Sequence, residues 1–126
     1  MAYRLSYSHL LREFGALGPY LCPEQCEPDR FFFDSRNPAV FPRHSGWGWW
    51  LLLEPCEGGF SGQSELAGYS ATGIWLNRPV PRTLWPELAS SRDQFLGRVE
   101  GLCRQWRLEL LDIERRELGR LTSVLS

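Results

Sequence analysis

The chain has 126 residues, of which 43% are hydrophobic and 23% charged, so it is long enough for one domain with its own core and too apolar for a disordered chain. Its fourteen basic and fifteen acidic residues leave a net charge of −1, which gives no broad field to attract a polyanion. The longest apolar run, residues 49–53, is far too short to cross a membrane, and the first residues lack the layout of a signal peptide. We therefore expect a cytoplasmic protein with a single domain over residues 1–126 and no membrane partner.

The first predicted element is a helix near the N-terminus, because Leu10, Phe14 and Leu17 recur at helical spacing and share one face. Serines just upstream can cap such a helix, and the glycines that follow can end it. Three prolines interrupt residues 19–29, so this stretch is expected to be a loop.

Three strands are predicted in the middle of the chain, near residues 31–34, 46–54 and 67–77. The segment 46–54 is the strongest of them, since its alternate residues place apolar side chains such as Trp49 on one face and Trp50 on the other. Apolar side chains on both faces are typical of a central strand that is covered on both sides. We therefore expect a small antiparallel sheet with this strand at its centre.

The last third of the chain is expected to be a long helical segment. Apolar residues recur at steps of three and four from Phe95 to Ile113, which forms a sustained helical face. An alternative stays open near the end, because Leu108 and Leu110 alternate with charged residues as they would in a strand. For residues 107–118 we favour the helix. The predicted fold is thus α+β, with the sheet packed against the N-terminal helix and this C-terminal segment.

The four cysteines are expected to be reduced thiols, because nothing in the sequence directs the chain to an oxidising compartment. Cys22 and Cys26 are separated by three residues, whereas Cys56 and Cys103 are solitary. A structural zinc site usually has two closely spaced pairs of ligands. Whether Cys22 and Cys26 bind a metal therefore stays open, and no metal or other cofactor is predicted.

The sequence shows no motif for catalysis. All fourteen basic residues are arginines, and a chain without lysine cannot form a phosphate-binding P-loop. An enzyme or a small-ligand-binding protein is an alternative, with an aromatic pocket between sheet and helix as its site. Such a pocket would need converging polar groups, for which Asp34, His44 and Glu54 are the candidates. We predict no enzymatic activity.

Six tryptophans in a chain of this size are more than a small core readily hides. Trp, Tyr and Arg are also the residues enriched where binding energy concentrates at protein interfaces. Two segments, one at the start of a predicted strand and one at the end of another, combine Trp and Arg with glycine or proline. From them we predict a partner-binding surface made of Arg43, His44, Trp47, Trp49, Trp75, Arg78 and Arg82.

These features favour a small cytoplasmic protein-binding module. The most specific hypothesis is a bacterial immunity-type inhibitor that neutralises a cognate toxin or effector, an analogy of size, compartment and missing catalytic motifs. A nucleic-acid-associated regulator is a further alternative, although the dispersed acidic residues leave no positive stripe for phosphates. Self-association into a homodimer also stays open, because Leu111, Leu118 and Leu125 are seven residues apart.

Overall fold

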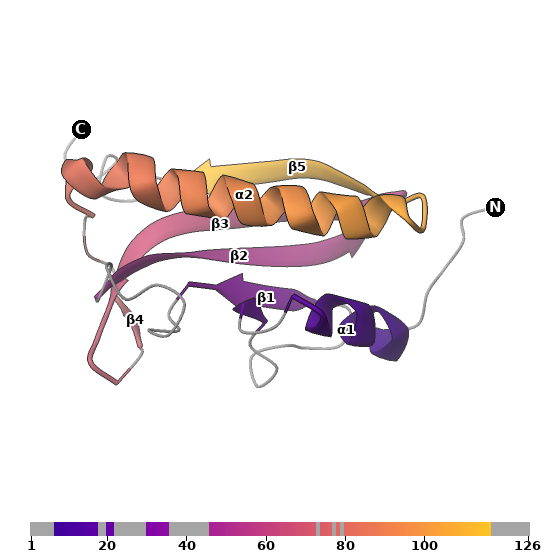
Figure 1. Ribbon diagram of the computed structural model, residues 1–126, viewed down its shortest axis with the longest axis horizontal. Helices are drawn as coiled ribbons and strands as arrows, with labels where there is room; N and C mark the ends of the chain where they lie inside the picture. The colour runs from indigo at the N-terminus through magenta and orange to yellow at the C-terminus, as the bar shows by residue number, and fades with distance from the viewer. Residues whose placement is uncertain are drawn as a thin grey trace.

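The computed structural model describes residues 7–17, 20–21, 30–35, 46–72, 74–76, 78 and 80–116. In chain order its elements are helix α1 (Tyr7–Gly15), strands β1 (Phe31–Asp34), β2 (Trp47–Cys56), β3 (Gly59–Tyr69) and β4 (Trp75–Leu76), a short 3-10 helix η4 (Arg82–Leu84), helix α2 (Trp85–Arg104) and strand β5 (Glu109–Arg116) (Figure 1). The predicted α+β class is confirmed, because one sheet packs against a short N-terminal helix and a long helix in the last third.

Helix α1 forms where the spacing of apolar residues predicts it. Leu10 and Phe14 are buried, and Leu17 follows just past the last helical turn, where its backbone N–H donates to the Phe14 carbonyl at 2.9 Å. The Phe14 ring packs edge-on against Phe31 and Phe33 of β1, with ring centres 4.7 and 5.6 Å apart. These contacts hold α1 against the first strand.

The sheet is antiparallel along the order β1-β2-β3-β4, and β5 joins it as a parallel partner of β3. Because β2 occupies the whole of one edge of β3, β4 and β5 share the other edge. The predicted strands at 31–34 and 46–54 are confirmed as β1 and β2, and β2 lies between two neighbours as expected. The predicted strand 67–77 is divided, because the chain turns at Ala71–Thr72 between β3 and β4.

Helix α2 begins at Trp85 and has Pro86 in its first turn, where the missing backbone N–H removes no helical hydrogen bond. Leu88, Phe95 and Val99 are among the buried residues on the face that covers the sheet. Among the described helices, none combines the length and the apolar character needed to cross a bilayer.

The segment after α2 is a strand and not a continued helix. Strand β5 runs parallel to β3, with Phe60 opposite Leu110 and Gly62 opposite Ile113. The helix favoured for residues 107–118 is therefore wrong over 107–116, because α2 ends at Arg104 and 109–116 form a strand. The last two residues lie outside the described part. The physical reason is pairing with a strand that is distant in the sequence, and such tertiary pairing overrides a local helical pattern.

Close backbone contacts bring β5 to the sheet. Arg107, in the turn after α2, has a positive φ of 59°, and the backbone N–H of Glu109 then donates to the Gly58 carbonyl at 3.1 Å. A Cβ atom on Gly59 would overlap the backbone of Glu109. Glycine at position 59 is therefore what allows the first residue of β5 to lie so near β3.

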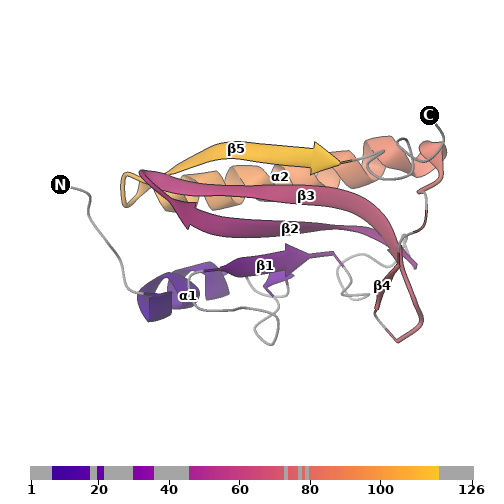
Figure 2. The ribbon, with the colours of Figure 1, turned by 180° about the vertical axis from the view of Figure 1, so that it is seen from behind.

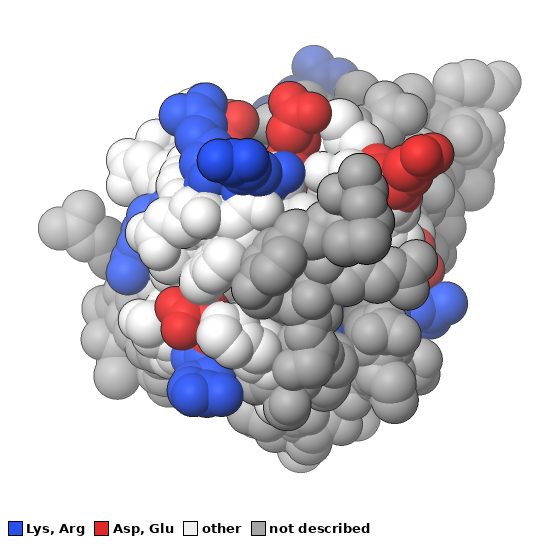
Figure 3. Space-filling model, turned by 90° about the vertical axis from the view of Figure 1, so that its right-hand side faces the viewer, with Lys and Arg blue, Asp and Glu red and all other residues white. Residues whose placement is uncertain are grey.

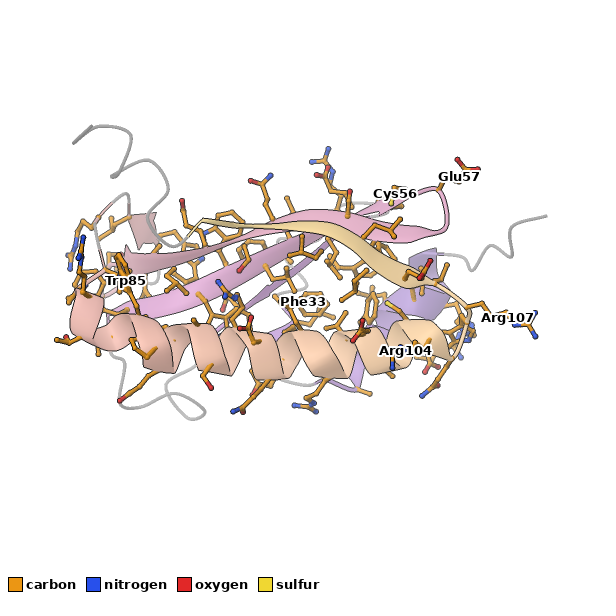
Figure 4. The ribbon with its side chains drawn as sticks, turned by 90° about the horizontal axis from the view of Figure 1, so that it is seen from above. Phe33, Cys56, Glu57, Trp85, Arg104 and Arg107 are labelled. Atoms are coloured by element: carbon orange, nitrogen blue, oxygen red, sulfur yellow. The ribbon has the colours of Figure 1, made fainter. Side chains whose placement is uncertain are left out.

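The core lies between α2 and one face of the sheet. Phe33, Trp49 and Leu51 have no exposed surface and pack with Phe95 from the helix, and Phe33 projects into this layer in Figure 4. The opposite sheet face carries no described helix, and in Figure 2 strands β2, β3 and β5 stand in front of α2. Among the described residues, a helix therefore covers β2 only on the face that carries Trp49. The sequence had predicted that this central strand would be covered on both faces.

Candidate protein-binding surface

Trp49, which the sequence places among the partner-binding residues, is a core residue. Its side chain is 0% exposed, and its ring centre lies 5.3 Å from that of Phe95 and 6.1 Å from that of Tyr20. The indole N–H donates to the hydroxyl of Ser91 on α2 at 3.0 Å. Because both its apolar surface and its donor are satisfied inside the fold, we leave Trp49 out of the candidate surface.

Trp47 and Arg78 meet at the end of the sheet where β2 begins and β3 ends, which we call the open end. They lie on the same face as the core. Trp47 pairs with Gly68 of β3, and its ring lies where a side chain at Gly68 would be. The guanidinium carbon of Arg78 is 4.6 Å from the centre of the Trp47 ring, within the range of a cation–π contact. The predicted pair is thus brought together, with the exposed cation lying on the indole.

Trp75 lies on the other face of the sheet. It pairs with Tyr69 across β3 and β4, and the two rings meet edge-on with centres 5.5 Å apart. Both rings approach Gly48 of β2, whose missing side chain leaves room for them. The predicted anchors therefore divide between two faces, because Trp47 and Trp75 occupy positions of opposite parity in the sheet.

On the same face as Trp75, Phe32 and Trp50 stack with ring centres 6.0 Å apart. We call the half-buried set Phe32, Trp50, Tyr69 and Trp75 the aromatic face. The alternation in 46–54 indicates an apolar second face, which was expected to be covered, and Phe32, Trp50 and Tyr69 are not among the predicted partner-binding residues. A row of half-buried rings on a sheet face that no described helix covers makes this face a candidate protein-binding surface.

Arg82, the last of the predicted residues that the structure describes, lies at the start of the helical region. Its guanidinium carbon is 5.4 Å from the centre of the Trp85 ring, and the Trp85 indole N–H donates to the Val80 carbonyl at 2.9 Å. Trp85 marks the beginning of α2 in Figure 4. Arg43 and His44 lie outside the described residues, as do Cys22 and Cys26.

The thiol and carboxyl groups suggested as sites for chemistry occupy different environments in the described part of the chain. This part contains no group of three or more His, Cys, Asp or Glu side chains arranged to hold a metal ion. Burial raises the pKa of the Cys103 thiol to about 11, so this thiol is protonated at neutral pH and is a poor nucleophile. Of the polar groups suggested for a pocket, Glu54 forms an ion pair with Arg30 at 3.2 Å instead of facing the core, and Asp34 is buried in the outer strand β1.

Charge is mixed on the part of the surface where it can be followed. At the end of the molecule shown in Figure 3, basic and acidic side chains of the described residues lie side by side. Arg104, for example, pairs with Glu100 at 3.6 Å on α2. The described residues on this end therefore form no basic stripe of the kind that nucleic acid requires.

Comparison with known proteins decides the family. The family model described as "Sigma factor-binding transcriptional regulator Crl" matches residues 1–117. The chain belongs to the Crl family. Curated relatives named sigma factor-binding protein Crl include one from Vibrio vulnificus, 30% identical over 95 residues that cover 71% of this chain and 74% of the relative. Another from Photobacterium profundum is 30% identical over 71% of each chain, and one from Vibrio cholerae is 27% identical over 71% of this chain and 74% of the relative.

Membership of the Crl family corrects the most specific sequence hypothesis. An immunity-type inhibitor of a secreted toxin or effector is wrong, because the family is described by its binding to a sigma factor. The broader prediction of a bacterial protein that binds another protein is confirmed. The family description names a regulator and no enzymatic activity. The leucine spacing that left a homodimer open stays untested, since Leu118 and Leu125 lie outside the described residues.

Proposed function

We propose that this chain binds a sigma factor, the subunit that directs bacterial RNA polymerase to promoters, and regulates transcription through that contact in the cytoplasm. The observation that carries the proposal is the family match over residues 1–117, a range that includes every described helix and strand.

We place the contact at the open end of the sheet. Trp75 and Tyr69 lie on one side of this end, and Trp47 with the Arg78 cation on its ring lies on the other. Aromatic and Arg side chains held in fixed positions lose little conformational freedom on binding, which is why they dominate interface energetics. Arg82 on the Trp85 ring extends the proposed surface toward α2, and Arg43 and His44 remain predicted members of it.

The test is calorimetric titration of the full chain with each purified sigma factor of its own organism. We expect a one-to-one complex with at least one of them. Trp75→Ala and Arg78→Ala should each weaken that complex about tenfold to thirtyfold, equivalent to about 1.4–2 kcal/mol. The matched control is Arg104→Ala, an exposed Arg at the far end of α2 that should leave affinity within about twofold. Failure of every sigma factor to bind the wild-type chain would refute the proposal.

A further inference from the structure

The turn between β3 and β4 presents Ile74 to solvent. Ile74 is 63% exposed, the largest value for a bulky hydrophobic side chain in the described part of the chain, and Leu111 on β5 follows at 36%. An isolated exposed aliphatic residue is ordinary on a protein surface. Exposure alone therefore does not mark a site, and the surroundings of Ile74 have to supply the argument.

Hydrogen bonds hold the backbone on which Ile74 stands. The Ser70 backbone N–H donates to the Ile74 carbonyl at 2.8 Å, and the Ile74 N–H donates to the Ser70 hydroxyl at 3.1 Å. The same hydroxyl lies 2.9 Å from that of Thr72. A turn fixed from both of its ends presents Ile74 in a defined position, so that little ordering remains to be done when a partner binds.

The apolar surface of the turn continues into the proposed binding surface. Strand alternation puts Ile74 on the same side as Leu76, which pairs with Gly68 beneath the Trp47 ring. On the other side, Trp75 packs against Tyr69. The hairpin that carries Ile74 directly after its turn thus has apolar groups on both of its sides.

The hairpin also extends away from α2 and from the body of the sheet, as its position in Figure 1 shows. Ala71 and Thr72, which share the turn, are small and exposed, and so leave the Ile74 side chain accessible. A projecting hairpin with apolar sides and a bulky aliphatic residue directly after its turn has the shape of a wedge. Its complement is a concave apolar surface and not a flat one.

We propose that Ile74 is an anchor residue that inserts into an apolar socket on the sigma factor, so that the β3–β4 hairpin enters a cleft of the partner. This inference rests on the proposed function and assigns a specific role within it. The exposed Arg78 cation, fixed 4.6 Å from the Trp47 ring centre, lies where the hairpin returns to the body of the protein. The rim of the socket is therefore expected to carry carboxylates.

The experiment measures the affinity of the full chain for the sigma factor that binds it, using four variants. Ile74→Asp should weaken the complex at least a hundredfold and Ile74→Ala about tenfold, whereas Ile74→Val, which keeps a branched side chain, should stay within about threefold. The matched control is Leu111→Asp, which adds the same charge at the other exposed hydrophobic residue and should leave affinity within about twofold.

Thermal unfolding of each variant separates binding from folding. The midpoint for the Ile74 variants should stay within about 2 °C of wild type, because a substitution at so exposed a position removes little buried surface. Wild-type affinity in Ile74→Asp, or an equal loss in Leu111→Asp, would overturn the anchor while leaving sigma-factor binding intact. A wild-type chain that binds no sigma factor would overturn both proposals.

Discussion

Replacement of Trp49 is the sharpest test of the core that supports this surface. Trp49 is 0% exposed, and its indole packs against Tyr20 and Phe95. Truncation of a fully buried aromatic residue removes its contacts and leaves a cavity, at a cost of about 3–5 kcal/mol. Trp49→Ala should therefore lower the free energy of unfolding by about that amount, a large share of the 5–15 kcal/mol typical of a domain.

The hydrogen bond of the same indole can be isolated from its packing. The Trp49 N–H donates to the Ser91 hydroxyl at 3.0 Å, and Ser91→Ala would leave a donor without its partner in a largely apolar site. We expect Ser91→Ala to cost about 1–2 kcal/mol. Trp49→Phe combined with Ser91→Ala should cost less than the sum of the single changes, by about 1 kcal/mol, because the two substitutions remove one shared bond.

Urea unfolding followed by circular dichroism measures these free energies, and its slope reports whether each variant still unfolds in one step. The comparison variant is Trp75→Ala, where a half-buried indole should cost clearly less stability than Trp49 while reducing affinity for the partner. A loss below about 1 kcal/mol for Trp49→Ala would contradict the reasoning, since it would mean that this indole contributes little to the core.

Three further predictions concern the junction of α2, β5 and the sheet. Gly59→Ala should lower the free energy of unfolding by about 2–3 kcal/mol and speed amide hydrogen exchange in β5, because the new methyl group would overlap the β5 backbone. Unchanged exchange rates in β5 would contradict this prediction. Arg107 has a φ of 59°, so Arg107→Gly should raise stability or leave it unchanged, whereas Arg107→Val should lower it by about 1 kcal/mol or more in the same urea assay. Burial raises the pKa of the Cys103 thiol from 9.0 to about 11. The contribution of this thiol to stability is therefore complete below pH 9 and is lost as pH rises toward 11, and Cys103→Ala should abolish that part of the alkaline loss. A thiol reagent should modify the exposed Cys56 well before Cys103.

Much of the local structure is readable from short-range patterns. Leu10 and Phe14 sit one helical turn apart, and their burial in α1 follows from that spacing. The alternation around Trp49 and Trp50 likewise predicts a strand with two apolar faces. Trp47 and Arg78, two of the predicted partner-binding residues, lie in contact, and the surface itself stays a prediction. Trp49 is buried in the core, which its residue type does not indicate, because residue type does not reveal which face of a strand a helix will cover.

The sequence by itself determined the helix at α1, the strands β1 and β2 and most of α2, because those preferences depend on neighbours within a turn or two of the chain. Tertiary structure decided that residues 109–116 leave the helical pattern and pair with β3, and that α2 seals one face of β2 while Phe32 and Trp50 stay half-buried on the other. Both outcomes arise from contacts between distant segments, whose energies a local pattern does not contain. The division of the tryptophans between core and surface follows from those contacts.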